Sequence, residues 1–510
     1  MKKILALILA LTMCVCALTA CGGSETTSES GAATTVADSK VLKVGINQDI
    51  DNFNPFTNQQ IPFVNVVNFN CYECLFHYNE DMELEMDLAT GYEMTDDVTY
   101  VINLREGVKF HNGEAFTAED VIYTIENIKD ENNAAWRFGQ YANVDTMTAI
   151  DAHTLEIKLV SPQASFVDNL AYTAIVSKST TPEELIANPV GTGAYKFISW
   201  TPNDCIKLEK FEEYWDADAV VCEELVLKVI PDTTVALTNL QSGEIQFMGG
   251  IDVESANTVS NTEGLKLLQS KYANTIYEVE IGRHNNAALA DPEVVRALFL
   301  ALDRETVAES VFGGLASPSK SPFPSAAKYY KEADTEGYDL ELAKEVLAGT
   351  EYADGFEFTV HVLTSDTLSQ QTMVIWQADL KELGVTMNID ICEVSVWLDA
   401  YLSRKYDMIA NYYSMVGTDP ATYCSVIMSA LGDYQTADLP ELNEAINNGA
   451  MGTDDSVRTE LYETVQDMIV KYRPVATYAE CPNLDGVAAN VGGVMVNGMG
   501  HTLLKNAHFE

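Results

Sequence analysis

The chain has 510 residues, of which 76 are acidic and 30 basic, for a formal net charge of −46 at pH 7. A field this negative opposes binding to nucleic acid or to an anionic membrane surface, because both carry the same sign of charge. A chain of this length exceeds what one hydrophobic core usually holds, so we expect two or more lobes.

The N-terminus predicts export and anchoring. Two lysines precede an apolar run, residues 4–18, which is too short to span a bilayer, since a spanning helix needs about 20 residues. The run ends in Leu-Thr-Ala-Cys, which resembles the lipobox of bacterial lipoproteins and implies that residues 1–20 are removed and that Cys21 carries the lipid. An ordinary secretory signal is the alternative. Residues 21–40 are small and polar without an apolar period, which predicts a flexible tether.

Cysteine and histidine spacing predicts no metal and no cofactor. Ten cysteines include two in the leader and the proposed anchor, which leaves an odd number that cannot all pair within the chain. Cys71 and Cys74 form a C-x-x-C motif, which would suit a redox pair, but no second motif completes a zinc cage. We expect these thiols to be packing residues.

The sequence also predicts no enzyme. It contains no G-x-S-x-G elbow, no phosphate-binding G-x-x-x-x-G-K-[ST] loop and no H-E-x-x-H pair. The alternative stays open, because catalytic groups can converge from distant positions in a chain.

Residues 98–121 predict a hairpin followed by a helix. Alternation over 98–113 is broken at Glu106-Gly107 and Asn112-Gly113, which predicts two strands with turns. Thr117 is expected as the N-cap of the next helix, with Asp120 near its positive end. His111 lies in the hairpin and is expected to be structural.

Residues 189–197, PVGTGAYKF, predict a tight turn and a strand. Gly191 and Gly193 bracket a threonine, which indicates a backbone that a Cβ atom would hinder. The alternation that follows is typical of a strand. Two further stretches come next in the chain, FEEYW at 211–215 and ALTNLQSGEI at 236–245.

From residue 290 the chain alternates between helix and strand patterns. Asp291-Pro292 predicts an N-cap and a first-turn proline ahead of an apolar stripe. Asp339 is expected to cap a helix that ends at Gly349. A helix over 371–383, closed by Gly384, then precedes a strand over 385–391, and 456–471 predicts a further amphipathic helix. Helix, glycine stop and strand in this order indicate an α/β unit.

The order of the PVGTG turn, the YW pair and the LQSGEI helix end resembles the family 5 solute-binding proteins of bacterial ABC importers. The YECLF and DPEVVRALFLALDR stretches are similar to segments of the same family, and the resemblance runs from Val41 to the C-terminus. It implies an α/β, two-lobed periplasmic-binding-protein-like fold of class II with an extra β-rich subdomain.

The resemblance also implies the domain boundaries. Lobe I would comprise 41–60, 188–273 and 485–510, with an inserted subdomain over 61–187, and lobe II would comprise 274–484. Two crossings near Tyr277 and Ala479 would form a hinge that closes around a ligand.

The implied partners are a small solute, most commonly a peptide, and an ABC permease that receives it. We expect a monomer on the extracytoplasmic face that touches the membrane only through its N-terminal lipid and binds no nucleic acid. A nickel chelate, an opine-like compound or an oligosaccharide are alternative ligands, and a sensor lipoprotein of the same fold is an alternative function.

One departure from the family bears on the ligand. In the peptide-binding branches an Asp four residues before a Pro holds the ligand's α-ammonium, and here that position is Val416, ahead of Pro420. Valine cannot accept this bond, and a buried ammonium without its partner costs about 3–5 kcal/mol. Either another carboxylate replaces it or the ligand has no free α-amine there. Asp419 is a candidate replacement, with a structural turn residue as the alternative.

The remaining expected ligand residues follow from the same resemblance. Trp397 matches a cleft tryptophan, Arg404 could bind a carboxylate bidentately, and Arg283 could meet an anionic group where the family usually has Asn. Apolar and stacking surface would come from Tyr412, Tyr413 and Met415. Core packing or solvated surface is the alternative for these residues.

Overall fold

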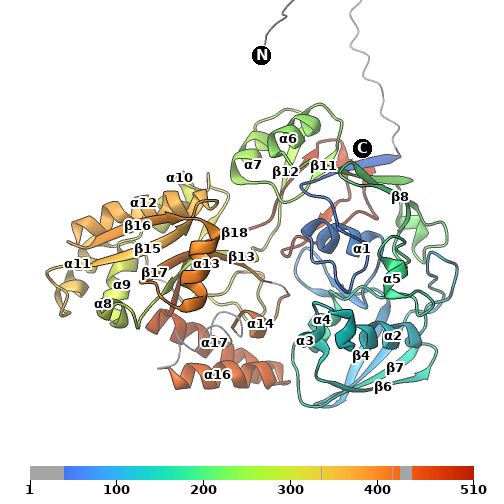
Figure 1. The fold of residues 1–510 in the computed structure, drawn as a ribbon, viewed down its shortest axis with the longest axis horizontal. Helices are drawn as coiled ribbons and strands as arrows, with labels where there is room; N and C mark the ends of the chain where they lie inside the picture. Colours follow the sequence, from blue (N-terminus) through green and yellow to red (C-terminus); the bar gives the residue numbers. More distant parts are fainter. Residues whose placement is uncertain (1–39, 335, 416, 425–438) are drawn as a thin grey trace, which may run out of the picture. The chain divides into compact units, whose positions relative to one another are not determined.

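The fold is that of a computed structural model, which describes residues 40–334, 336–415, 417–424 and 439–510 (Figure 1). These residues all belong to one unit, Ser39–Glu510. Among them, no helix is both long enough and apolar enough to span a bilayer.

A seven-stranded sheet joins the start, middle and end of the chain. Only β1 is parallel to its two neighbours, β10 and β11, and the other neighbouring strands are antiparallel. In sheet order the strands are β12 (Leu265–Gln269), β19 (Leu484–Ala488), β11 (Phe247–Met248), β1 (Val41–Ile46), β10 (Glu224–Val229), β9 (Cys205–Lys210) and β8 (Tyr195–Thr201). Helices α6 (Thr233–Gln241) and α7 (Val253–Ser260) pack beside β11 and β19.

A four-stranded antiparallel sheet lies within the segment between β1 and β8. Its order is β4 (Ala89–Asp96), β5 (Thr99–Leu104), β7 (Thr154–Leu159) and β6 (Val144–Asp151). Helices α2 (Ala118–Lys129), α3 (Phe138–Tyr141) and α4 (Phe166–Leu170) lie alongside it (Figure 1). Shorter elements complete this part: β2 (Phe76–Tyr78) with β3 (Leu84–Met86), a π-helical turn at Phe63–Val67, α1 (Asn68–Asn70) and α5 (Pro182–Leu185).

The expected hairpin over 98–113 is wrong in its second strand. Strand β5 pairs with β4 and β7, and the segment after Gly107 forms only one isolated bridge, Lys109 to Ala115. The backbone N–H of His111 instead donates to the carbonyl of Gly191, so a tertiary contact displaces the local pairing. The helix that follows is confirmed, with Thr117 as N-cap and Asp120 accepting from the Thr117 N–H.

The second large sheet has six strands. In order they are β14 (Ser317–Pro318), β18 (Val475–Cys481), β13 (Thr275–Ile281), β17 (Met408–Ser414), β15 (Glu357–Leu363) and β16 (Thr386–Cys392). Residues of α9 (Pro292–Leu300), α11 (Leu340–Ala348) and α12 (Thr367–Glu382) share one core cluster with the sheet, whereas α13 (Val394–Ser403) contributes to a different cluster with β16 and β17. Helices α8 (Ala287–Ala290), α10 (Arg304–Ser310), α14 (Pro420–Cys424), α16 (Pro440–Met451) and α17 (Asp455–Tyr472) complete this part.

The predicted helix ends at Asp291, Asp339 and Gly384 are confirmed. Asp291 and Asp339 each accept a backbone N–H at the first turn of α9 and α11. Helix α17 covers the predicted segment and is capped by Asp454, a residue that was not predicted as a cap from the sequence. Gly384 follows α12 with φ +77°, a conformation that glycine adopts without strain. Helix α12 begins at Thr367, four residues earlier than predicted, because Asp366 provides the N-cap.

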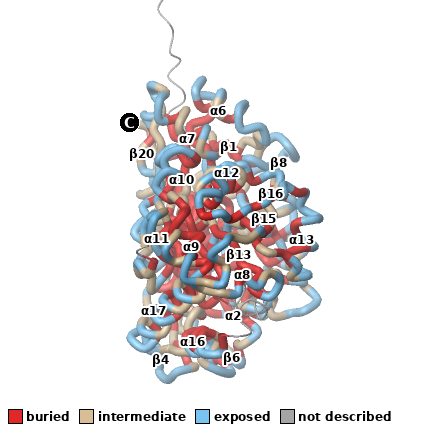
Figure 2. Tube along the Cα trace, turned by 90° about the vertical axis from the view of Figure 1, so that its left-hand side faces the viewer, coloured by how far each residue is buried: buried red, intermediate tan, exposed pale blue. Residues whose placement is uncertain are grey.

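Each large sheet has its own buried cluster, and Figure 2 shows buried positions through the interior with exposed turns outside. The chain passes between the sheets twice, from β12 to β13 and from β18 to β19. Tyr277 and Ala479 are register partners in β13 and β18, a few residues inside these crossings. The lobe boundaries and the hinge motion stay predictions.

The sequence motifs meet around one buried carboxyl group. Tyr214 Oη and Trp215 Nε1, the YW pair, both donate to Glu73 Oε1, at 2.7 and 3.0 Å. A Cβ atom on Gly191 would lie 2.1 Å from the carbonyl oxygen of Cys71, so the PVGTG glycines are required by the close approach of the backbone at residues 70–72, where the YECLF segment begins. Burial, and then the charge of Asp87, raises the pKa of Glu73 to about 8.

Candidate functional site

A cavity of about 470 Å³ lies where the two large sheets meet. From the first sheet it takes residues at the ends of β1 and β11, Ile46 and Gly249 among them, and from the second it takes the start of β13 and the end of β17. Strands β1 and β11 are parallel and both end here, and ligands of open α/β sheets bind beyond the carboxyl ends of parallel strands. The volume lies in the range of small-molecule sites.

Two oppositely charged side chains line the cavity. Among the lining residues that the structure describes, Arg137 is the only arginine or lysine and Asp485 is the only acid. The Arg137 guanidinium lies 4.0 Å above the Trp136 ring, and its Nη1 donates to Gln140 Oε1 at 2.9 Å. The geometry therefore offers one cation and one anion to a ligand, within a largely apolar wall.

His501 also lines this cavity, as a stacking group. Its ring stacks on Phe69 at 4.3 Å and meets Tyr172 edge-on at 5.2 Å. Burial lowers the pKa of His501 to about 3, so the imidazole is neutral at physiological pH.

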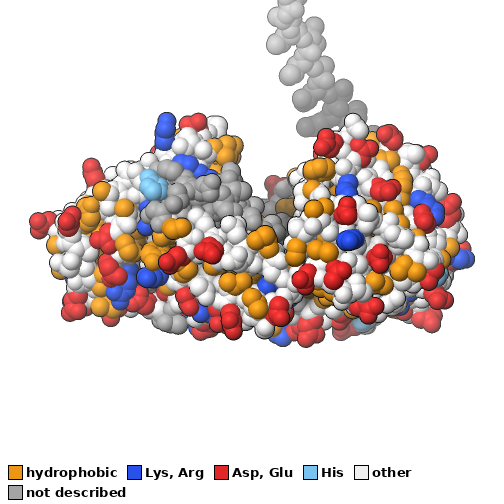
Figure 3. Space-filling view, turned by 90° about the horizontal axis from the view of Figure 1, so that it is seen from below, with side chains coloured by type: hydrophobic (Ala, Val, Ile, Leu, Met, Phe, Trp, Pro, Cys, Tyr) orange, Lys and Arg blue, Asp and Glu red, His pale blue; other side chains and the backbone are white. Residues whose placement is uncertain are grey.

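Asp485 is the residue that sequence reasoning missed. It lies in β19, is 2 % exposed, and its Oδ1 accepts the Gly250 N–H at 2.8 Å. The signal was present in the sequence, since an aspartate interrupts the buried Leu-Asp-Gly-Val-Ala strand. This one aspartate could not be singled out from the sequence, because the chain has 76 acidic residues. Figure 3 shows many acidic side chains on one face of the surface.

Asp419 lies outside this cavity and has its own partners. Arg458 Nη2 donates to both of its carboxylate oxygens, at 2.9 and 2.7 Å, and both side chains are nearly fully buried. The backbone N–H of Asp419 and the hydroxyl of Thr418 donate to Asp168, which comes from the four-stranded part of the chain. This polar cluster ties the two halves of the unit together beside a second cavity of about 620 Å³.

Of the predicted ligand residues that the structure describes, only Met415 lines the 470 Å³ cavity, where it is buried. Val416 lies outside the described residues, as does Cys21. Trp397 is buried in α13, where it stacks on Tyr401 and donates to the Ala410 carbonyl at 3.2 Å. Arg404 ends the same helix with its guanidinium 5.0 Å from the Tyr401 ring.

The other predicted residues lie along the second sheet. Tyr412 of β17 is half exposed and lines a separate hollow of about 1000 Å³, whose other walls come from α7 and the start of α12. Tyr413 packs against Tyr423, with ring centroids 4.9 Å apart. Arg283 is buried just after β13. The structure therefore does not bring the seven predicted residues that it describes together at one cavity.

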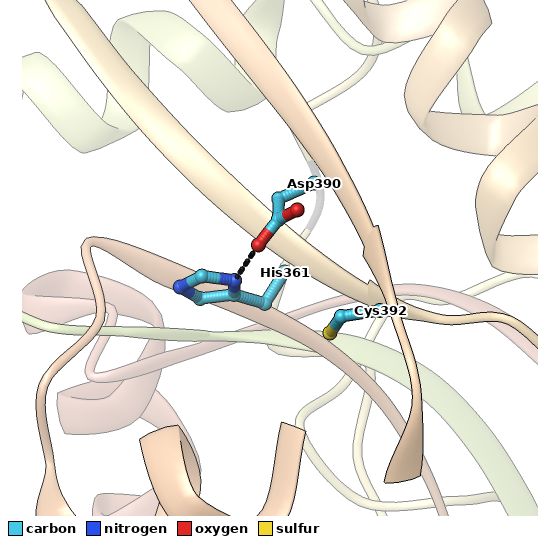
Figure 4. A group of neighbouring side chains, drawn as sticks. All are labelled: His361, Asp390 and Cys392. Carbon is cyan, nitrogen blue, oxygen red and sulfur yellow. Dashed lines mark hydrogen bonds and ion pairs between the residues drawn. The ribbon is translucent and has the colours of Figure 1, made fainter. Parts of the chain in front are cut away.

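A group of three potential metal ligands lies on β15 and β16. His361 and Asp390 point toward each other, with Cys392 beside them (Figure 4). Their ligand atoms lie within 4.8 Å of one another, but His361 Nδ1 and Asp390 Oδ2 already form a 2.7 Å hydrogen bond. Burial, together with Asp390 and Glu393, raises the pKa of the Cys392 thiol, which opposes the thiolate that a metal needs. These contacts disfavour a metal ion at this group, and the absence of a metal site stays a prediction from the sequence.

The seven cysteines in the described part of the chain are free thiols. Five of them are buried, and burial raises the pKa of Cys71 to about 12. Buried thiols with raised pKa are poor nucleophiles, which favours the packing interpretation.

Comparisons with known proteins place this fold. The glutathione-binding protein GsiB of Pectobacterium atrosepticum is 27% identical over 415 residues, covering 78% of this chain and 80% of that protein. The ABC transporter substrate-binding protein CtaP of Listeria monocytogenes superposes with a TM-score of 0.82 at 23% identity, covering 92% of this chain and 99% of that one. The dipeptide-binding protein of a Pseudoalteromonas species, in complex with Met-Leu, gives a TM-score of 0.72 at 21% identity, covering 92% of this chain and 100% of that one.

The structural likenesses show a two-lobed periplasmic-binding-protein fold, as the sequence resemblance implied. Residues 83–435 match the family described as bacterial extracellular solute-binding proteins, family 5, middle. This match spans more than half of the chain and includes the YW pair, the LQSGEI helix end and the DPEVVRALFLALDR stretch. The chain belongs to the bacterial extracellular solute-binding proteins of family 5.

Proposed function

We propose that this protein captures a short peptide or a similar zwitterionic solute in the 470 Å³ cavity and delivers it to an ABC permease. The observation that carries the proposal is the cavity itself, in which one buried guanidinium and one buried carboxylate stand in a largely apolar wall between the sheets. A zwitterion presents the complementary pair of charges. The name of the GsiB relative supports the same class, because glutathione is a zwitterionic tripeptide.

The protein would bind its ligand without transforming it. His501 supports this, because its ring is packed between Phe69 and Tyr172 and its pKa is lowered to about 3, which makes it a poor general base near pH 7. Incubation of the purified protein with its ligand, followed by mass spectrometry of the free solute, would reveal turnover if the protein were an enzyme.

Ligand binding would close the lobes by rotation about the two crossings near Ser270–Asn274 and Pro482–Asn483. Both crossings are short, and residues Asn274 and Asn483 line the cavity, so a ligand there contacts the segments that must move. Small-angle scattering with and without ligand would measure the change in radius of gyration.

The first experiment is native mass spectrometry of residues 41–510 as purified. A receptor at 100 times the Kd of its ligand gains about 2.7 kcal/mol of stability, so a ligand can survive purification. An adduct that fragments into amino acids would support a peptide receptor. An adduct of another kind would replace the peptide by that ligand class. If no adduct appears and no peptide, chelate or sugar raises the melting temperature, the receptor proposal fails.

Two further parts of the proposal concern the cell surface. Cys21 would carry the lipid anchor, and Cys21→Ala should release the protein from the membrane fraction into the medium. The protein would act as a monomer, and light scattering of residues 41–510 should give the mass of one chain.

Co-purification with the permease should be stronger for loaded than for empty protein, whereas a sensor would show no such difference.

A further inference from the structure

Asp485 differs from the other buried aspartates in how its carboxylate is satisfied. Asp334 is paired with Arg304 and Arg473, and Asp419 is paired with Arg458. Asp485 has one backbone hydrogen bond, from Gly250 to Oδ1, and Oδ2 has no hydrogen-bond partner among the described residues.

The Asp485 carboxyl group is buried, but it belongs to the wall of the cavity. Buried polar atoms in proteins are nearly always hydrogen-bonded, and a buried charge without a partner costs several kcal/mol. Asp485 is 2 % exposed, yet it lines the cavity, so its side chain is shielded from bulk water while it faces a space that a ligand can fill. Burial raises the pKa of Asp485 to about 7, as expected for a carboxylate that lacks a cation.

The surroundings of Asp485 suit a compact cation. Gly249 and Gly250 form the adjoining wall, and a Cβ atom on Gly249 would lie 3.2 Å from Asp485 Oδ1, so glycine keeps side-chain atoms away from the carboxylate. Asn274 and Asn483 line the same cavity and carry amide side chains. A primary ammonium has three N–H donors and can be shared between a carboxylate and amide oxygens.

We propose that Asp485 binds the primary ammonium group of the ligand and so makes this receptor selective for solutes with a free amine. The inference rests on the proposed function and names the chemistry of its ligand. It also explains why position 416 needs no carboxylate. Ser414, Met415 and Gly417, which flank that position, line the same cavity as Asp485, so Asp485 can bind the ammonium group instead. The carboxylate comes from β19 of the first sheet rather than from the loop after β17.

The test compares free and acetylated amines in the wild-type protein and in two variants. Titration calorimetry at pH 7.5 would use glutathione and trialanine, each with a free or an N-acetylated amine, together with any solute released from the purified protein. Asp485→Asn keeps the size of the side chain and removes its charge. Glu209→Gln is the matched control, because it removes one exposed charge from β9 of the same sheet, outside the cavity.

We expect N-acetylation to weaken binding to the wild-type protein at least about 100-fold, the loss that corresponds to a buried charge without its partner. Asp485→Asn should weaken binding of the free-amine probe to a similar extent and change binding of the acetylated probe less than about threefold. Glu209→Gln should leave both affinities unchanged. The acetylation comparison needs no variant, so it holds even if Asp485→Asn folds poorly.

Three results would overturn the inference. Equal losses for both probe forms in Asp485→Asn would mean that the residue only shapes the cavity, and no loss would mean that another group holds the amine. A bound solute that reductive methylation shows to lack an amine would refute amine selectivity while leaving the receptor function intact. Failure of every solute class to bind would instead refute the proposed function itself.

Discussion

Arg458→Met tests the buried charge cluster that joins the two halves of the unit. The guanidinium is 3 % exposed and makes four hydrogen bonds, two to Asp419, one to the Gly449 carbonyl at 2.8 Å and one to Tyr329 Oη at 2.9 Å. Methionine keeps the apolar stem and removes every donor. The variant leaves the Asp419 carboxylate buried beside Asp168 without a cation, and the free energy of unfolding should fall by about 3–5 kcal/mol.

The reverse change should cost less. In Asp419→Asn the Arg458 guanidinium keeps its hydrogen bonds to the Gly449 carbonyl and to Tyr329 Oη. It also keeps its contacts with two tyrosine rings, whose centroids lie 5.0 and 5.4 Å away. The double variant contains no unpaired charge at this position and should recover most of the stability lost in Arg458→Met. Urea unfolding followed by tryptophan fluorescence and by circular dichroism would measure all four proteins, and coincident transitions are required for the cycle.

The pH dependence gives an independent check. Burial and the neighbouring Asp419 raise the pKa of Asp168, and loss of Arg458 removes the cation that balances these two carboxyl groups. Protonation of Asp168 at low pH then relieves the repulsion between them, so the deficit of Arg458→Met should be larger at pH 8 than at pH 5. The reasoning is refuted if Asp419→Asn is as damaging as Arg458→Met, if the double variant recovers nothing, or if the deficit does not change with pH.

Three further predictions concern the turn, a buried acid and the ammonium position. Gly191→Ala places a Cβ atom 2.1 Å from a backbone carbonyl oxygen and should cost roughly 3 kcal/mol, whereas Gly139→Ala, with open space around it, should be neutral or stabilising in thermal melts. Glu73 has a pKa raised to about 8, so wild-type stability should fall as pH rises from about 5 to 8, and Glu73→Gln should flatten this slope in urea titrations; an unchanged slope would contradict the burial argument. Val416→Asp should strengthen binding of peptides with free N-termini in calorimetry, and no effect would show that the register assumed from the sequence is wrong.

The sequence predicted elements whose signals are local. Asp291, Asp339 and Gly384 mark helix ends because a cap or a positive φ depends on a few neighbouring residues. The hairpin prediction failed after Gly107 for the complementary reason, since the backbone of His111 is bonded to Gly191, which lies 80 positions away in the chain. A strand pattern gives the tendency to extend but not the partner.

The sequence by itself therefore determined the family, the helix caps and the close-packed glycine turn, because each is written in contiguous residues. Only the tertiary structure decided which charged side chains line the 470 Å³ cavity. Asp419 was the carboxylate that the sequence offered, and the fold pairs it with Arg458. Asp485 was one acid among many, and the fold buries it in the wall of the cavity that Arg137 also lines. Whether a carboxylate is satisfied depends on side chains that converge from distant segments, and no local pattern encodes that convergence.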